Sequence, residues 1–89
     1  MSHGLHPSAA ALRTHERACE RGEAGYMDPD SGLFVMTSLH LANQGVCCGN
    51  GCRHCPWPQE AQARAGRPGL PCYAYPGGVE GVLRAAKAR

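Results

Sequence analysis

The sequence predicts a small α+β fold stabilised by a metal. Its expected parts are an N-terminal helix, a β-hairpin, a short helix, a cysteine-rich loop and a flexible C-terminal tail. A chain of 89 residues makes one small domain, whose core is marginal without a metal or a covalent staple. Four of the six cysteines stand within residues 47–55. We therefore expect a metal-binding domain over residues 8–58 and a Pro/Gly-rich tail over residues 59–89.

Residues 8–21 have the pattern of a helix. Ser8 can cap its start, the interior is rich in Ala, Leu, Arg and Glu, and Gly22 stands where a C-terminal glycine belongs. Leu12, His15 and Cys19 share one face at spacings of three and four, which predicts the buried side.

Residues 26–37 predict a β-hairpin. Pro, Asp, Ser and Gly at 29–32 are turn residues, and residues 33–37 are bulky enough for the return strand. We interpret Asp28 and Asp30 as turn chemistry rather than a catalytic pair. The large apolar residues here and just beyond predict the core: Tyr26, Met27, Leu33, Phe34, Val35, Met36, Leu39, Leu41, Val46 and Trp57.

The elements after the hairpin are shorter. Thr37 or Ser38 can cap a helix over residues 39–43. Residues 59–67 predict a helical turn or a linker. Residues 79–89 predict a short helix with Val79, Val82, Leu83 and Ala86 on one side. Gly81 weakens it, and so short a helix is marginal alone, so we expect loose attachment of the tail.

The composition argues against several classes of function. The net charge is +2 with no basic run, so the electrostatic footprint of nucleic-acid binding is missing. No stretch is apolar enough to span a membrane, and residues 1–13 lack the apolar core of a secretory signal. We expect a cytoplasmic protein, where clustered cysteines favour metal or redox chemistry over disulfides. No serine–histidine–acid set or phosphate-binding loop is visible, so a binding protein is favoured over an enzyme.

The cysteine loop carries the chemistry. Cys48, Cys52 and Cys55 form a Cys-xxx-Cys-xx-Cys pattern, and Gly49 and Gly51 tolerate the positive φ of a tight wrap that turns sulfurs inward. Packed thiolates repel one another, so the cluster makes sense around a cation or as a disulfide. Two adjacent cysteines usually cannot both bind one ion without strain. Cys47 is therefore open between ligation and a supporting role.

The spacing favours an iron–sulfur cluster. A contiguous loop that grips three corners, with a distant fourth ligand, is typical of such clusters. Structural zinc usually takes two separated ligand pairs, and zinc stays as the alternative, with copper(I) or redox thiols behind it. Radical S-adenosylmethionine enzymes share the spacing but need a far longer chain. The candidates for the fourth ligand are Cys47, Cys19, Cys72 and a histidine, His40 or His54.

Each of these outer candidates also has a structural interpretation. Cys19 fits a helix core, and Cys72 fits an incidental thiol. His54 stands between two ligands, and we expect it to point outward into solvent. His40 fits a half-buried packing role. We expect Trp57 to pack over the loop and shield it from water.

Two motifs carry a resemblance to a known family. They are Tyr-x-Asp-Pro-x-x-Gly and Cys-Cys-Gly-x-x-Cys-Arg-His-Cys-Pro-aromatic. The first comprises Tyr26, Asp28, Pro29 and Gly32; the second comprises Cys47, Cys48, Gly49, Cys52, Arg53, His54, Cys55, Pro56 and Trp57. Over residues 12–57 the chain resembles small cysteine-rich proteins of bacteria with mitochondrial relatives in animals. That family has no established activity, so the resemblance implies a site and no reaction.

The loop is also similar to the Cys-Cys-Gly-x-Gly-Cys-x-x-Cys signature of oxidoreductase-like domains, some of which are joined to flavin-dependent reductases. This similarity implies electron transfer or metal handling, with a redox enzyme as the protein partner.

Overall fold

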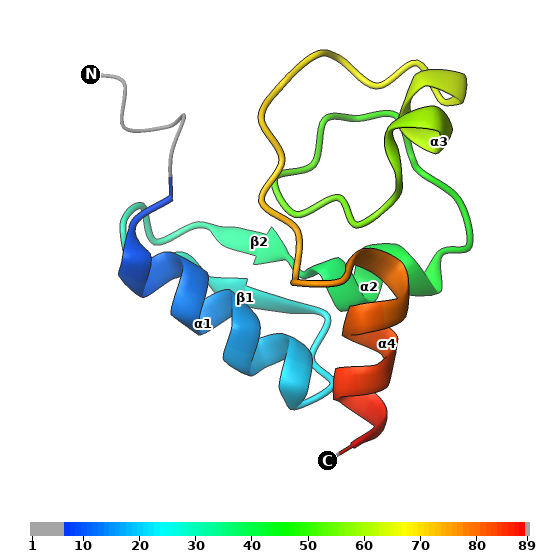
Figure 1. The fold of residues 1–89 in the computed structure, drawn as a ribbon. Coiled ribbons are helices and arrows are strands. Elements are labelled where there is room, and N and C mark those ends of the chain that lie inside the picture. Colours follow the sequence, from blue (N-terminus) through cyan, green and yellow to red (C-terminus); the bar gives the residue numbers. More distant parts are fainter. Residues whose placement is uncertain (1–6, 89) are drawn as a thin grey trace.

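The computed structural model describes residues 7–88, which form four helices and one antiparallel hairpin (Figure 1). Residues 1–6 and Arg89 lie outside the described residues. Residues 1–6 belong to the segment 1–13, in which we expected no secretory signal. The α+β class is confirmed. The elements are α1 (Ala9–Glu20), β1 (Gly25–Met27), β2 (Phe34–Met36), α2 (Ser38–Asn43), α3 (Gln59–Arg64) and α4 (Gly78–Lys87).

Helix α1 begins and ends as the sequence predicts. The Ser8 hydroxyl accepts a hydrogen bond of 3.1 Å from the backbone N–H of Ala11, which satisfies one of the free donors of the first turn. Gly22 follows the helix with φ of 78°. His15 and Cys19 lie on the buried side, so the predicted face is confirmed.

The hairpin pairs Tyr26 with Val35 and Met27 with Phe34. Alternate side chains point to opposite faces of a sheet, and α1 lies beside this one (Figure 1). Tyr26 is consequently buried, whereas Met27 and Phe34 are 59% and 64% exposed. The predicted core was therefore wrong for five residues that the structure leaves exposed: Met27, Leu33, Phe34, Met36 and Val46.

Helix α2 takes its cap from Thr37, whose hydroxyl accepts from the backbone N–H of His40 at 3.2 Å. Ser38 is instead the first helical residue. The helix buries Leu39, Leu41 and Ala42, and places the start of the cysteine loop directly after its last turn.

Helix α4 overturns the expectation of a loosely attached tail. It packs against α1 and α2, and Val82 is fully buried in a cluster with Cys19, Leu39 and Ala42. Gly81 lies close to the segment that leads into α4, where a Cβ would meet the carbonyl oxygen of Pro76. A helix that is marginal alone is thus stabilised by burial of its apolar stripe.

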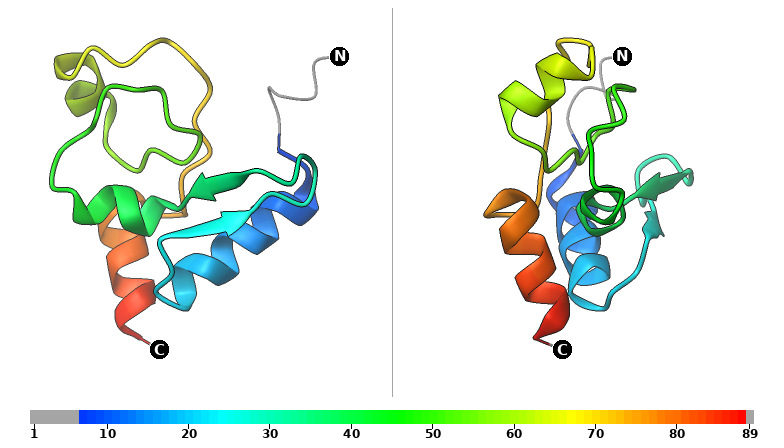
Figure 2. Two further views of the ribbon diagram at one scale, coloured as in Figure 1. Left: turned by 180° about the vertical axis from the view of Figure 1, so that it is seen from behind. Right: turned by 90° about the vertical axis from the view of Figure 1, so that its right-hand side faces the viewer.

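Helices α1, α2 and α4 and the hairpin occupy one side of the molecule, and the cysteine loop and α3 occupy the other. Both views in Figure 2 place α1, α2, α4 and the hairpin together, with the loop, α3 and the segment after α3 beside them. No helix among residues 7–88 is long and apolar enough to cross a membrane.

Candidate metal centre

Glycines shape the backbone of the cysteine loop. Gly49 and Gly51 have φ of 78° and 74°, so both adopt the left-handed conformation for which they were singled out. Gly49 also lies against the end of α3, where a Cβ would meet the carbonyl oxygen of Ala65. The loop can therefore turn tightly and still pack on the helix that follows it.

The four loop cysteines form two pairs of neighbouring sulfurs. The Sγ atoms of Cys47 and Cys55 are 3.7 Å apart, and those of Cys48 and Cys52 are 3.4 Å apart. Cys47 and Cys55 are buried, and Cys48 is exposed. Cys47, which the sequence left ambiguous, is thus placed with the other three.

All four sulfurs border one narrow crevice, which we call the thiol crevice. It is too narrow to admit a water molecule. Its lining consists of Leu41, Gln44, Val46, Cys47, Cys48, Gly51, Cys52, Cys55, Trp57 and Arg67. Trp57 packs beside the sulfurs as expected, with its indole N–H donating to the carbonyl of Leu41 at 3.1 Å.

The Cys47–Cys55 pair has the sulfur spacing found around a tetrahedral metal ion, and the Cys48–Cys52 pair is somewhat closer. Zinc–thiolate bonds are about 2.3 Å long, which puts two thiolates on one ion about 3.8 Å apart. Within residues 7–88, however, no three Cys, His, Asp or Glu side chains converge closely enough to hold an ion together. The thiols therefore fit as two separate two-sulfur sites.

Electrostatics oppose ionisation of the whole set. A backbone N–H from Asn50 lowers the pKa of the Cys48 thiol. Burial raises the pKa of Cys52 to about 11, and the neighbouring Cys48 acts in the same direction. Burial likewise raises the pKa of Cys55 to about 11, against a backbone N–H from Trp57. Four thiolates here require a cation to compensate their charge.

Arg67 adds a buried donor to the crevice. Its guanidinium donates from Nη2 to the carbonyl of Cys52 at 2.9 Å and from Nη1 to the carbonyl of Leu70 at 3.0 Å. Its Nε is buried, and it is the one such side-chain nitrogen or oxygen without a hydrogen-bond partner in the described part of the chain. A buried donor of this kind calls for an acceptor.

His54 lies inside the protein, so the expectation of a solvated side chain was wrong. It is fully buried. Its Nδ1 lies 2.7 Å from the carbonyl of Tyr73, and its Nε2 lies 2.7 Å from the hydroxyl of Tyr26. Both ring nitrogens are used by other groups, which removes His54 from the candidate ligands.

A buried polar network surrounds His54. Its ring stacks on that of His15 at 3.6 Å between centroids. Arg53 reaches from the loop to the hydroxyl of Tyr26 at 3.3 Å and to the carboxylate of Asp28 at 3.4 Å. Burial lowers the pKa of His15 to about 3 and that of His54 to about 4, so both rings are neutral at pH 7. No pattern in the sequence indicated this network, although Tyr26, Asp28, Arg53 and His54 all belong to the two motifs described above.

Two other candidates lie away from the thiol crevice. Cys19 belongs to the core beneath α4, and burial raises its pKa. His40 lies on α2 beside Gln44, 3.4 Å from its side-chain amide. Neither borders the crevice, so the structure does not bring them to the loop.

Residues 67–75 run along the cysteine loop, and we call them the strap. The backbone N–H of Tyr73 donates to the carbonyl of Arg53 at 2.8 Å, and the Cys72 thiol donates to the carbonyl of Cys55 at 2.7 Å. Cys72 is thus a fifth thiol beside the loop, although it does not border the crevice. Nothing in the strap sequence indicated these contacts.

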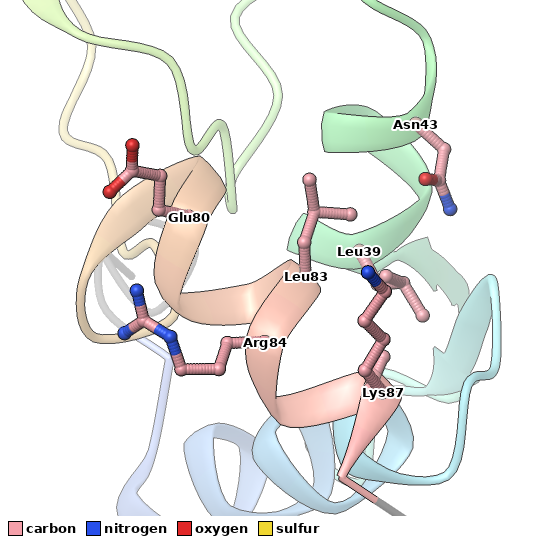
Figure 3. Close-up of a pocket in the computed structure, with 7 residues that line it drawn as sticks. Leu39, Asn43, Glu80, Leu83, Arg84 and Lys87 are labelled. Atoms are coloured by element: carbon pink, nitrogen blue, oxygen red, sulfur yellow. The ribbon is translucent and has the colours of Figure 1, made fainter.

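A larger groove lies elsewhere. It has a volume of about 600 Å³ between α2 and α4 and is lined by Leu39, Asn43, Glu80, Leu83, Arg84, Ala86 and Lys87. Figure 3 shows Leu83 between the two helices, with Glu80 and Arg84 on one side of α4. None of the candidate ligands borders it.

Comparison with known proteins gives a family and no fold match. Residues 14–61, more than half of the chain, match DUF5522, a family of unknown function. The match includes the hairpin and the cysteine loop and ends before the strap. No solved structure matches the chain.

Proposed function

Since the chain belongs to DUF5522, a family of unknown function, we propose its function from the site: the loop binds a metal–thiolate centre through Cys47, Cys48, Cys52 and Cys55. The observation that carries the proposal is the pairing of their sulfurs at 3.7 and 3.4 Å around one dry crevice. The partnerless Nε of Arg67 adds support, because a negatively charged centre supplies the acceptor that this buried donor lacks.

The centre we propose is a [2Fe–2S] cluster. Such a cluster takes four cysteines, two on each iron. The two sulfur pairs, Cys47 with Cys55 and Cys48 with Cys52, would supply the two ligands of each iron. The cluster would supply one-electron transfer. The chain's own residues would hold it, exclude water with Trp57, and stabilise thiolates through the N–H groups of Asn50 and Trp57.

A carrier role follows from the surroundings of the crevice. The exposed Cys48 brings one pair to the surface, where an electron can pass to a partner. The similarity of the loop to oxidoreductase-like domains supports the same role. We therefore propose an electron carrier or accessory of a redox enzyme, with a protein rather than a nucleic acid as the partner and the cytoplasm as its compartment.

Metal analysis of protein purified without oxygen tests the proposal. We expect brown protein with about two irons and two acid-labile sulfides per chain. Cys52→Ser and Cys47→Ser should lose the colour, one variant from each pair. Cys72→Ser is the matched control, because its thiol lies beside the loop but outside the crevice. Colourless wild-type protein without iron would overturn the cluster.

A zinc-stabilised interaction module is the second candidate. The exposed apolar side chains of the hairpin favour it: Met27, Leu33, Phe34 and Met36 are 43% to 67% exposed. Stoichiometric zinc in colourless protein, together with unfolding on chelation, would support this candidate over the first. Protein that stays folded after complete demetallation would count against it.

A further inference from the structure

We infer that Arg67 is a binding residue of the metal–thiolate centre, whose Nε–H donates a hydrogen bond to a sulfur of that centre. The inference rests on the proposed function and goes beyond it, because Arg67 lies in the strap and outside the residues that match the family. It adds a non-cysteine residue to the site.

The three nitrogens of the Arg67 guanidinium differ in their hydrogen bonds. Its two terminal nitrogens are committed to backbone carbonyls: Nη2 to Cys52 at 2.9 Å, and Nη1 to Leu70 at 3.0 Å and Pro68 at 3.3 Å. Nε is buried and has no partner among residues 7–88. Leaving a charged donor buried and unpaired costs free energy, because the donor has lost its hydrogen bonds to water. An acceptor in the crevice removes that cost.

The Arg67 side chain also lies in the right place. Arg67 borders the thiol crevice together with all four cysteines, and it is the one charged residue in that lining. Its Nη2 donates to the backbone carbonyl of Cys52 at 2.9 Å, so the guanidinium lies beside a residue of one sulfur pair.

The positive charge of Arg67 also balances the negative charge of the centre. Four thiolates outweigh the two positive charges of an oxidised [2Fe–2S] core, so the centre is negative overall. Cys47 and Cys55 are buried, so water does little to screen the charge on their side of the crevice. A guanidinium that is held in place by four backbone carbonyls supplies a fixed compensating cation without rearrangement.

The arrangement also links the strap to the site. The same guanidinium binds the loop at Cys52 and the strap at Leu70. When Nε–H has its acceptor, the guanidinium holds the strap against the loop at two points, the carbonyl of Cys52 and a sulfur of the centre. Loading of the centre should therefore order residues 67–75.

The test compares Arg67→Lys with Arg64→Lys. Lysine keeps the charge but lacks the fork, and Arg64 is a matched control because it lies on α3 outside the crevice lining. We expect Arg67→Lys to lose iron several-fold faster to a chelator, and its reduction potential to move to a more negative value, because hydrogen bonds to cluster sulfurs raise the potential. Arg64→Lys should match the wild type in both measurements.

A second measurement observes the donor itself. In ¹⁵N-labelled wild-type protein loaded with diamagnetic zinc, the Nε–H of Arg67 should exchange with water much more slowly than in metal-free protein. Equal exchange in the two states, or an Arg67→Lys variant that matches the wild type in metal retention and potential, would overturn the role of Arg67. Wild-type protein that retains no metal would instead overturn the proposed function. The two failures are therefore distinguishable.

Discussion

The hydroxyl of Tyr26 donates a hydrogen bond of 2.7 Å to Nε2 of His54, and this bond joins the hairpin to the cysteine loop. Its direction follows from the other ring nitrogen. The carbonyl of Tyr73 can only accept, so Nδ1 of His54 carries the hydrogen and Nε2 is the acceptor. Two motifs that are separate in the sequence are thus one structural unit.

The first prediction concerns this bond. Tyr26→Phe keeps the ring but leaves Nε2 of His54 buried without a donor and deprives Arg53 of an acceptor. The free energy of unfolding should fall by about 1–3 kcal/mol, the cost of an unsatisfied buried polar group. Urea denaturation of metal-free protein under reducing conditions measures the change.

Tyr75→Phe is the control for this prediction. The Tyr75 hydroxyl also makes a short bond, 2.8 Å to the carboxylate of Glu20, but this bond is exposed to solvent. Water can replace the lost partner there, so the stability should change by less than about 0.5 kcal/mol. Equal losses in the two variants would show that the buried bond has no special importance.

The second prediction is a dependence of stability on pH. Burial lowers the pKa of His15 to about 3 and of His54 to about 4 in the folded state, whereas both return to about 6.5 on unfolding. Near pH 5 the unfolded chain therefore binds about two more protons than the folded chain. The stability is fully present above about pH 7.5 and is lost as the pH falls below about 6.5.

Urea titrations of metal-free protein between about pH 5 and pH 7.5 check this dependence. His40→Gln is the control, because His40 lies on α2 away from the buried pair. That variant should keep the full slope. Equal stability of the wild type across this range would mean that the two rings are not held neutral by the fold.

Local signals in the sequence predicted most of the secondary structure. The cap at Ser8, the glycine at 22 and the turn at 29–32 act through neighbouring backbone groups, so their residue types are sufficient evidence. The same holds for the left-handed glycines of the cysteine loop. The four loop cysteines were likewise visible, because their clustering needs no knowledge of the fold.

Long-range contacts were not predictable in the same way. His54 is buried because Tyr26 and Tyr73 approach it from positions 28 residues before and 19 residues after it. The Pro/Gly-rich strap gave no sign that Arg67 borders the thiol crevice. Gly81 weakens an isolated helix, but Val82 beside it packs against Cys19, Leu39 and Ala42, which lie far away in the sequence. Residue types alone do not reveal which distant group will be the partner.

The third prediction distinguishes two costs at glycine positions. Gly45 and Gly49 both have positive φ, but only at Gly49 would a Cβ meet another group, the carbonyl of Ala65. Gly45→Ala should cost about 1 kcal/mol for the backbone conformation. Gly49→Ala should cost clearly more and should also weaken metal binding, because the loop must move away from α3. Urea denaturation and competition with a chelator measure the two effects, and similar values for both variants would argue against the close packing.

The fourth prediction tests whether α4 belongs to the core. Val82 is fully buried against Cys19, Leu39 and Ala42, so Val82→Ala leaves a cavity between three helices. The loss should be about 1–3 kcal/mol, a large part of the stability of so small a domain. Leu70→Ala is the control, because this leucine is 51% exposed and its truncation should cost little.

Thermal unfolding followed by circular dichroism measures both variants. A loosely attached tail predicts the opposite order, in which Val82→Ala unfolds like the wild type. If α4 is instead part of the core, Val82→Ala weakens its packing against α2. The start of the cysteine loop follows α2, so the loop should be loosened as well. Val82→Ala should then retain metal less well than Leu70→Ala, although neither residue borders the thiol crevice.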